Sequence, residues 1–178
     1  MKNPKKLGED LVYKSRVFSL YRSTYARANG GKVNMDIIRH KGAVAILPVT
    51  KDGSIILEKQ FRYALNSWLW EVPAGTIEDD EEPLECARRE LKEETGYEGT
   101  GFKKVGEVIP APGYDDEKLV LFIVKVSGAP KAKKLDEDEL IETSMITADK
   151  AVKMVLNGRI RDSKSVALIT ISRLRGYI

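Results

Sequence analysis

Three glutamates on one predicted helix are placed where they could bind a divalent cation. The segment from Pro83 to Thr95 predicts a helix, because a proline opens it, acidic residues fill its first turn and Gly96 follows its end. At about 100° per residue, Glu90, Glu93 and Glu94 fall on one face of this helix. Three unpaired carboxylates there would repel one another, and a hard cation with oxygen ligands, such as Mg²⁺ or Mn²⁺, would remove the conflict. A solvated acidic helix face is the alternative interpretation.

A motif that extends beyond the helix bears on this choice. From Gly75 the sequence runs glycine, five residues, Glu81, seven residues and then the letters RELKEETGY at 89–97. All seven fixed letters of the Nudix box stand here in order, a match that arises by chance in on the order of one chain in a million. The chain therefore resembles the Nudix hydrolases, although Tyr97 stands where an aliphatic residue is commoner.

The resemblance implies a chemistry and a set of metal ligands. Members of this family cleave nucleoside diphosphates linked to another moiety, with water attacking one phosphorus of the P–O–P bridge while metal ions neutralise the developing charge. By resemblance, Glu90 and Glu94 are metal ligands, Glu93 assists them, and the carbonyl of Ala74 is a backbone ligand. The expected cofactor is Mg²⁺, with Mn²⁺ as a possible substitute.

Three further residues of the box are expected to have structural roles. Gly75 permits the tight loop that precedes the helix. Glu81 and Arg89 are expected to form an ion pair that holds this loop on the helix, rather than to act in catalysis.

Similarity outside the box indicates which subfamily of the Nudix hydrolases the chain resembles. The stretches WEVPAG at 70–75, KQFRY at 59–63 and GRIRDSK at 158–164 are similar to ADP-ribose pyrophosphatases and related nucleoside diphosphate sugar hydrolases. Pro112 follows Gly96 by sixteen residues, an offset that resembles ADP-ribose hydrolases rather than dinucleoside polyphosphate hydrolases. We therefore expect Pro112 and Gly113 at the substrate, although Pro-Gly is also a common turn.

The resemblance implies that ADP-ribose is hydrolysed to AMP and ribose 5-phosphate. Another nucleoside diphosphate sugar, such as GDP-mannose, is the alternative substrate. A sensor that binds ADP-ribose without cleaving it is a third hypothesis, which the complete set of box carboxylates disfavours.

Candidate substrate contacts come from two regions. Arg62 is suited to clamp a diphosphate, because a guanidinium fork binds two phosphate oxygens at once, although an arginine in a hairpin can also be a solvated edge residue. Near the N-terminus, Phe18, Tyr21, Tyr25 and Arg39 offer the aromatic faces and the cation that would suit a purine. Their alternation is equally typical of a β core or a dimer surface.

The general base has several candidates. Glu137 and Glu139 match the acidic positions of a loop that carries a catalytic glutamate in relatives, although the run at 136–139 also fits a solvated loop. Glu117, in the loop after Pro112, and Glu93 are the other two.

The pattern of strands and helices predicts an α+β protein with the Nudix fold, a mixed β-sheet sandwiched between helices. Residues 1–40 are expected to form an antiparallel β extension that makes a homodimer, as the resemblance implies, and residues 41–178 the catalytic domain. Strands are predicted at 15–25, 32–38, 43–49, 54–60, 68–72, 103–109 and 118–126, with further helices at 147–157 and 163–175. The turn Asn29-Gly30-Gly31 predicts a hairpin between the first two strands.

Composition excludes several classes of protein. The 178 residues carry 30 Lys and Arg against 27 Asp and Glu, and no stretch approaches the ~20 apolar residues that a membrane span needs. The start contains no apolar signal core, so we expect a cytoplasmic protein. One cysteine and one histidine exclude both an internal disulfide and a zinc site of the usual His/Cys type. Basic residues near the N-terminus are scattered rather than clustered, so no nucleic-acid partner is expected.

Overall fold

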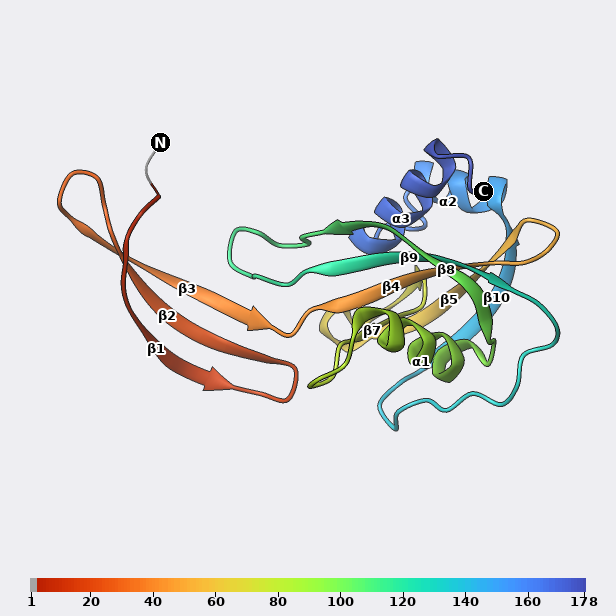
Figure 1. Cartoon of the computed structure of the whole chain (residues 1–178), viewed down its shortest axis with the longest axis horizontal. Coiled ribbons are helices and arrows are strands. Elements are labelled where there is room, and N and C mark those ends of the chain that lie inside the picture. The colour runs from red at the N-terminus through yellow and green to blue at the C-terminus, as the bar shows by residue number, and fades with distance from the viewer. Residues whose placement is uncertain (1–2) are drawn as a thin grey trace. The chain divides into compact units, whose positions relative to one another are not determined.

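The computed structural model describes residues 3–178, and Figure 1 shows the course of the chain. The chain forms two compact units, which are described separately. The first contains the residues up to Gly42 together with Ile109–Lys118, and the second contains Ala43–Val108 together with Leu119–Ile178. No helix within residues 3–178 is long and apolar enough to cross a membrane.

The first unit contains a three-stranded antiparallel sheet in the order β1-β2-β3. Its strands are β1 (Lys6–Lys14), β2 (Phe18–Ala26) and β3 (Lys32–His40). Gly30, in the turn between β2 and β3, has a φ of 85°, in the left-handed region that favours glycine. The predicted hairpin and the N-terminal antiparallel sheet are therefore confirmed. β1 was not predicted, because its side chains are exposed almost throughout and no buried face marks it as a strand.

The second unit contains a seven-stranded mixed sheet. The main path is β10-β5-β4-β9-β8, while β6 pairs with β5 and β7 pairs with β4. β4 and β9 are parallel, and the other pairs are antiparallel. The bounds are β4 (Ala43–Val49), β5 (Ser54–Arg62), β6 (Ser67–Glu71), β7 (Ala74–Thr76), β8 (Gly99–Val108), β9 (Leu119–Val126) and β10 (Ile141–Thr147), with a 3-10 turn η1 (Tyr63–Leu65) between β5 and β6.

Helices cover both faces of this mixed sheet (Figure 1). On one face, Leu91 of α1 (Pro83–Thr95) packs in a core with Ile46 and Ile56. On the other face, Leu168 of α3 (Ser163–Leu174) and Met154 of α2 (Ala148–Leu156) share a second core with Leu57. β4 contributes alternate side chains to each core, as its apolar sequence predicted. The predicted fold, a mixed sheet between helices, is confirmed.

The helix ends follow signals that the sequence contains. α1 spans the predicted residues, and Gly96 ends it with a φ of 74° while its N–H donates to the Lys92 carbonyl. Thr147 caps α2 by accepting a hydrogen bond from the Lys150 N–H, and Asp162 caps α3 in the same way. β7 and β10 were not predicted, because β7 has three residues and β10 mixes polar and apolar residues without strict alternation.

Candidate active site

Two carboxylates of the box, those of Glu90 and Glu94, lie between α1 and the short strand β7. Glu94 is 2% exposed, Glu90 is also buried and Glu93 is half-buried. Glu94 Oε2 accepts a hydrogen bond of 2.9 Å from the N–H of Ala74. This bond joins the last turn of α1 to the strand whose carbonyl was predicted as a ligand, and that role of Ala74 remains a prediction.

Arg89 is the central cation of the box. It donates two hydrogen bonds to Glu81, of 2.8 and 2.9 Å, one of 2.6 Å to Glu90 and one of 3.3 Å to Glu93. Glu81 also accepts the N–H of Glu78 at 3.0 Å, so the predicted pair does hold the preceding loop on the helix. The bond from Arg89 is the main cause that lowers the pKa of Glu81 to about 2.

The expectation that the three carboxylates lack partners was wrong. Arg89 lies one residue from Glu90 and one helical turn from Glu93, so its long side chain reaches both. Glu94 instead accepts a hydrogen bond from the backbone N–H of Ala74. Accordingly, no three His, Cys, Asp or Glu side chains in the described part of the chain stand grouped to hold an ion. An ion bound here would replace Arg89 as the partner of Glu90 and Glu93. Arg89 would still be paired with Glu81.

Gly75 has a different role from the one predicted. Its φ is not positive, so the backbone does not need glycine for a tight loop. A Cβ at this position would instead lie 1.9 Å from the carboxyl carbon of Glu90. The absence of a side chain therefore makes the space that the Glu90 carboxylate occupies.

Burial opposes the negative charge of these glutamates. Burial is the main cause that raises the pKa of Glu94 well above its usual range, and the charges of Glu58 and Glu90 add to the effect. Burial also raises the pKa of Glu90, although Arg89 acts against it. Carboxylate oxygens held close to a backbone strand are the donor set of a hard divalent cation, and its charge would offset this cost. The donor types present therefore suit such an ion, once Glu90 and Glu93 are released from Arg89.

A second network of charges fixes Arg62. Its Nε and one terminal nitrogen donate to Glu71 at 2.8 and 2.5 Å, and Glu71 is 1% exposed. Lys164, at the start of α3, also binds Glu71 and donates to Asp162 at 3.0 Å. Burial acts to raise the pKa of Glu71, but Arg62 and Lys164 outweigh it and hold this pKa below its usual value.

Arg62 also lines an open groove on the second unit. The groove measures about 630 Å³, and Arg161 and Lys164 line it as well. Glu71 and Asp162 line the groove too, so the guanidinium has a fixed orientation at a concave surface that carries charges of both signs. Contact between Arg62 and a substrate remains a prediction.

Sequence reasoning missed Glu58, Glu71 and Lys164 as members of a charged cluster. Glu58 is 1% exposed and Lys164 is 8% exposed. The sequence did contain a signal for Glu58. It lies two residues after Ile56 in the apolar strand run IILEKQF, so its side chain is expected on the same buried face of the strand. Lys164 gave no such signal, because only the fold brings it to Glu71, 93 residues away in the chain.

The two acidic loop candidates differ in their surroundings. Glu139 is half-buried, accepts a hydrogen bond of 3.0 Å from the Asp136 N–H, and its charge raises the pKa values of Glu58, Glu90 and Glu94. Glu137 is exposed. Glu139 therefore has an electrostatic effect on the box carboxylates Glu90 and Glu94.

Arg39 and Phe18 belong to the first unit. Arg39 donates to Asp116 at 2.7 Å and to Glu9 at 2.9 Å, and both acidic partners raise its pKa. The ring of Phe18 lies 6.3 Å from that of Tyr13, and its side chain is exposed. Their roles toward a purine remain predictions.

Pro112, Gly113 and Glu117 also belong to the first unit, in the segment Ile109–Lys118. The Glu117 N–H donates to Asp115 at 2.8 Å. Glu117 Oε1 lies 3.6 Å from His40 Nδ1 in the same unit. The roles of these three residues in substrate binding or catalysis likewise remain predictions.

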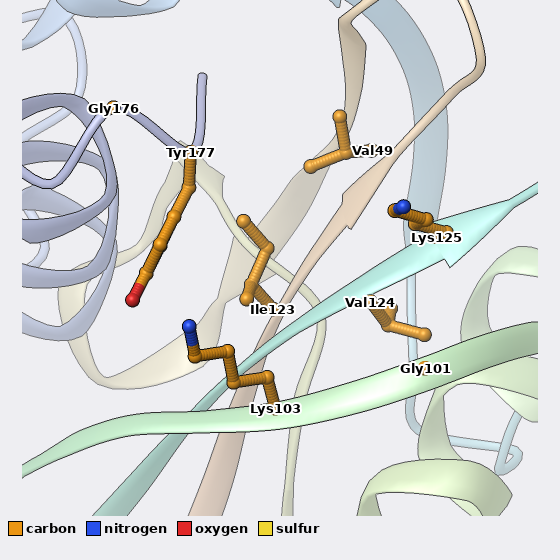
Figure 2. A pocket seen from close by; sticks show the side chains of 8 residues that line it. All are labelled: Val49, Gly101, Lys103, Ile123, Val124, Lys125, Gly176 and Tyr177. Carbon is orange, nitrogen blue, oxygen red and sulfur yellow. The ribbon is translucent and has the colours of Figure 1, made fainter.

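A separate cavity of about 320 Å³ lies on the second unit beside the end of α3 (Figure 2). Lys103 and Lys125 line it, together with Ile123 and Tyr177, and the Lys103 Nζ lies 4.3 Å from the centre of the Tyr177 ring. The residues that line it include no carboxylate side chain. This cavity therefore lacks the donors of a site for a divalent cation.

Comparisons with known proteins agree with this geometry. The NUDIX domain family matches residues 39–169. The ADP-ribose pyrophosphatase of Bacillus subtilis (strain 168) is 36% identical over 172 residues, which cover 96% of this chain and 93% of that protein. The GDP-mannose pyrophosphatase of Cronobacter sakazakii (strain ATCC BAA-894) is 34% identical over 188 residues, and the alignment covers 96% of this chain and 95% of that protein.

The fold has a counterpart among solved structures. A crystal structure of an ADP compounds hydrolase superposes with a TM-score of 0.84 over 99% of this chain and 97% of that chain, at 22% identity. With the family match above, the chain belongs to the Nudix family. It is a Nudix hydrolase, as the box predicted.

We expect Gly75→Ala to displace the Glu90 carboxylate while the protein stays folded, because only a side chain blocks the added methyl group. Metal affinity and kcat should fall by roughly 10- to 100-fold. Gly106→Ala is the matched control, since Gly106 is also a strand glycine without a positive φ and has open space around its Cβ position. Steady-state kinetics with circular dichroism checks this, and equal activity of the two variants would contradict it.

Proposed function

We propose that the protein is a cytoplasmic homodimer that hydrolyses the diphosphate bond of ADP-ribose with Mg²⁺, giving AMP and ribose 5-phosphate. One observation carries the proposal most directly: the complete box places buried Glu90 and Glu94 against Gly75 and Ala74. The similarity over 96% of the chain to an ADP-ribose pyrophosphatase supports the choice of substrate.

Glu90, Glu93 and Glu94, with the Ala74 carbonyl, would hold the divalent ion. When bound, the ion supplies positive charge that offsets the charge developing on the diphosphate in the transition state. In this hypothesis Arg62 binds two diphosphate oxygens, and Glu71 fixes the orientation of its fork. Water adds to one phosphorus as the bridging P–O bond breaks, so ADP-ribose and water yield the two monophosphates, which release two protons when both are dianions.

Glu139 is our candidate for the base that takes the proton of the attacking water. We expect Glu139→Gln to lower kcat by roughly 10²-fold or more, because an amide cannot accept that proton. Glu137→Gln is the matched control, since it makes the same change two residues earlier at an exposed position. Steady-state kinetics at saturating Mg²⁺ distinguishes the two, and a large loss in the Glu137 variant alone would reverse the assignment.

Dimer formation is supported by apolar side chains on the first unit. Seven of them are exposed on or beside its three-stranded sheet, namely Leu7, Leu11, Val12, Tyr13, Val17, Phe18 and Met35. Exposed apolar side chains gathered on one surface are typical of a protein–protein interface. Sedimentation equilibrium should give twice the chain mass of 19.9 kDa, and a monomer at micromolar concentration would contradict the dimer.

GDP-mannose is the second candidate substrate, because the Cronobacter sakazakii relative named for it covers 96% of this chain. A panel of ADP-ribose, GDP-mannose, UDP-glucose, diadenosine polyphosphates and NADH tests both, with phosphate release measured after coupling to a phosphatase, with and without Mg²⁺. We expect ADP-ribose to give the highest kcat/KM and chelation to stop it. A higher kcat/KM for another sugar nucleotide would overturn the substrate, and tight binding without turnover would indicate a sensor.

A further inference from the structure

Glu58 is a buried carboxylate outside the Nudix box. It lies in β5, two residues after Ile56, so the two side chains are on the same face of the sheet. Ile56 packs in the core that contains Leu91 of α1, and that identifies this face as the one covered by α1. The Glu58 carboxylate therefore lies between the sheet and the helix that carries the box glutamates.

One oxygen of Glu58 has no partner within residues 3–178. Glu58 Oε1 is fully buried and accepts no hydrogen bond from the described residues, and the side chain is 1% exposed. Buried polar atoms without protein partners are rare in folded proteins, and a bound ion is one established explanation for such an atom.

The neighbours of Glu58 carry charges of both signs, because Lys133 and Lys164 act on it as well as Glu71 and Glu139. Glu71 stands directly opposite it on β6, and like charges at such a position repel one another. Arg62 and Lys164 balance the charge of Glu71. Glu94 is also buried, on the helix that covers this face of the sheet.

We propose that Glu58 is a further ligand of the divalent ion, and that its Oε1 approaches the ion from β5 while Glu94 approaches it from α1. The inference rests on the proposed function, since it concerns the same ion. An ion at this place would give Oε1 a partner and would separate the charges of Glu58 and Glu94. The metal centre would then extend from the box onto the sheet.

A Mn²⁺ binding titration, monitored by the electron paramagnetic resonance signal of the free ion, tests whether Glu58 is a ligand and does not depend on turnover. Glu58→Gln keeps the shape of the side chain and removes its charge, so we expect Mn²⁺ affinity to fall roughly 10- to 100-fold. Glu142→Gln is the matched control, because Glu142 is an exposed carboxylate on β10, which also pairs with β5. Its affinity should stay within about twofold of wild type, since water and salt screen it.

Thermal unfolding in EDTA accompanies the titration and shows whether each variant folds. If Glu58→Gln is folded and binds Mn²⁺ as wild type does, the carboxyl group is not a ligand and the inference is overturned. If the glutamine variant does not fold, Glu58→Asp, which withdraws the carboxylate by one methylene, is judged by the same criterion. Failure of the wild type itself to bind Mn²⁺ would refute the proposed metal centre as a whole, which is a distinct result.

Discussion

Replacing Glu94 with glutamine is expected to lower kcat/KM for ADP-ribose by roughly 10³-fold or more while the protein stays folded. The side chain is buried on the face of α1 that meets β7, and our proposal makes it a direct ligand of the ion. A glutamine oxygen can still accept the hydrogen bond from the Ala74 N–H, so the contact between helix and strand survives. The loss should therefore lie in ion binding and catalysis, not in stability.

Glu85→Gln provides the control for this variant, since Glu85 lies on the same helix with an exposed carboxylate. Initial rates over a range of Mg²⁺ concentrations, together with thermal unfolding in EDTA, measure both effects. A Glu94 variant that keeps more than about a tenth of wild-type kcat/KM would contradict its role as a ligand.

Replacing Lys164 with methionine is expected to cost about 3 kcal/mol of the free energy of unfolding. Lys164 and Arg62 both bind the buried carboxylate of Glu71, and the variant leaves Arg62 alone to balance it. The change also breaks the bond between Lys164 and Asp162 at the start of α3. For a chain of this size, the melting temperature should fall by roughly 10 °C.

Lys153→Met, at an exposed position on α2, is the matched control for the loss of a lysine charge. Differential scanning calorimetry of both variants gives the comparison. A melting temperature for the Lys164 variant within about 2 °C of the control would show that Arg62 is a sufficient partner for Glu71.

Local sequence signals predicted the elements that present the box. The bounds of α1 follow from Pro83 and Gly96, and helical periodicity correctly placed Glu90, Glu93 and Glu94 on one side. Those signals operate within a few residues, so they required no knowledge of the fold. The hairpin at Gly30 was predictable for the same reason.

Contacts between distant segments could not be predicted in this way. Glu71 and Lys164 are 93 residues apart, and only the docking of α3 beside β6 brings them together. The role of Gly75 was misread because its reason is the position of the Glu90 side chain and not its own backbone. Arg89 was underestimated because spacing alone does not show how far a long side chain reaches.

Identification of the reaction products tests the central claim most directly. ADP-ribose is incubated with the enzyme and Mg²⁺ in water enriched in ¹⁸O, and the products are separated and analysed by mass spectrometry. We predict equal amounts of AMP and ribose 5-phosphate, with one ¹⁸O atom incorporated into one of the two and no reaction after chelation by EDTA. Cleavage at any other bond, or turnover that persists in EDTA, would contradict the account.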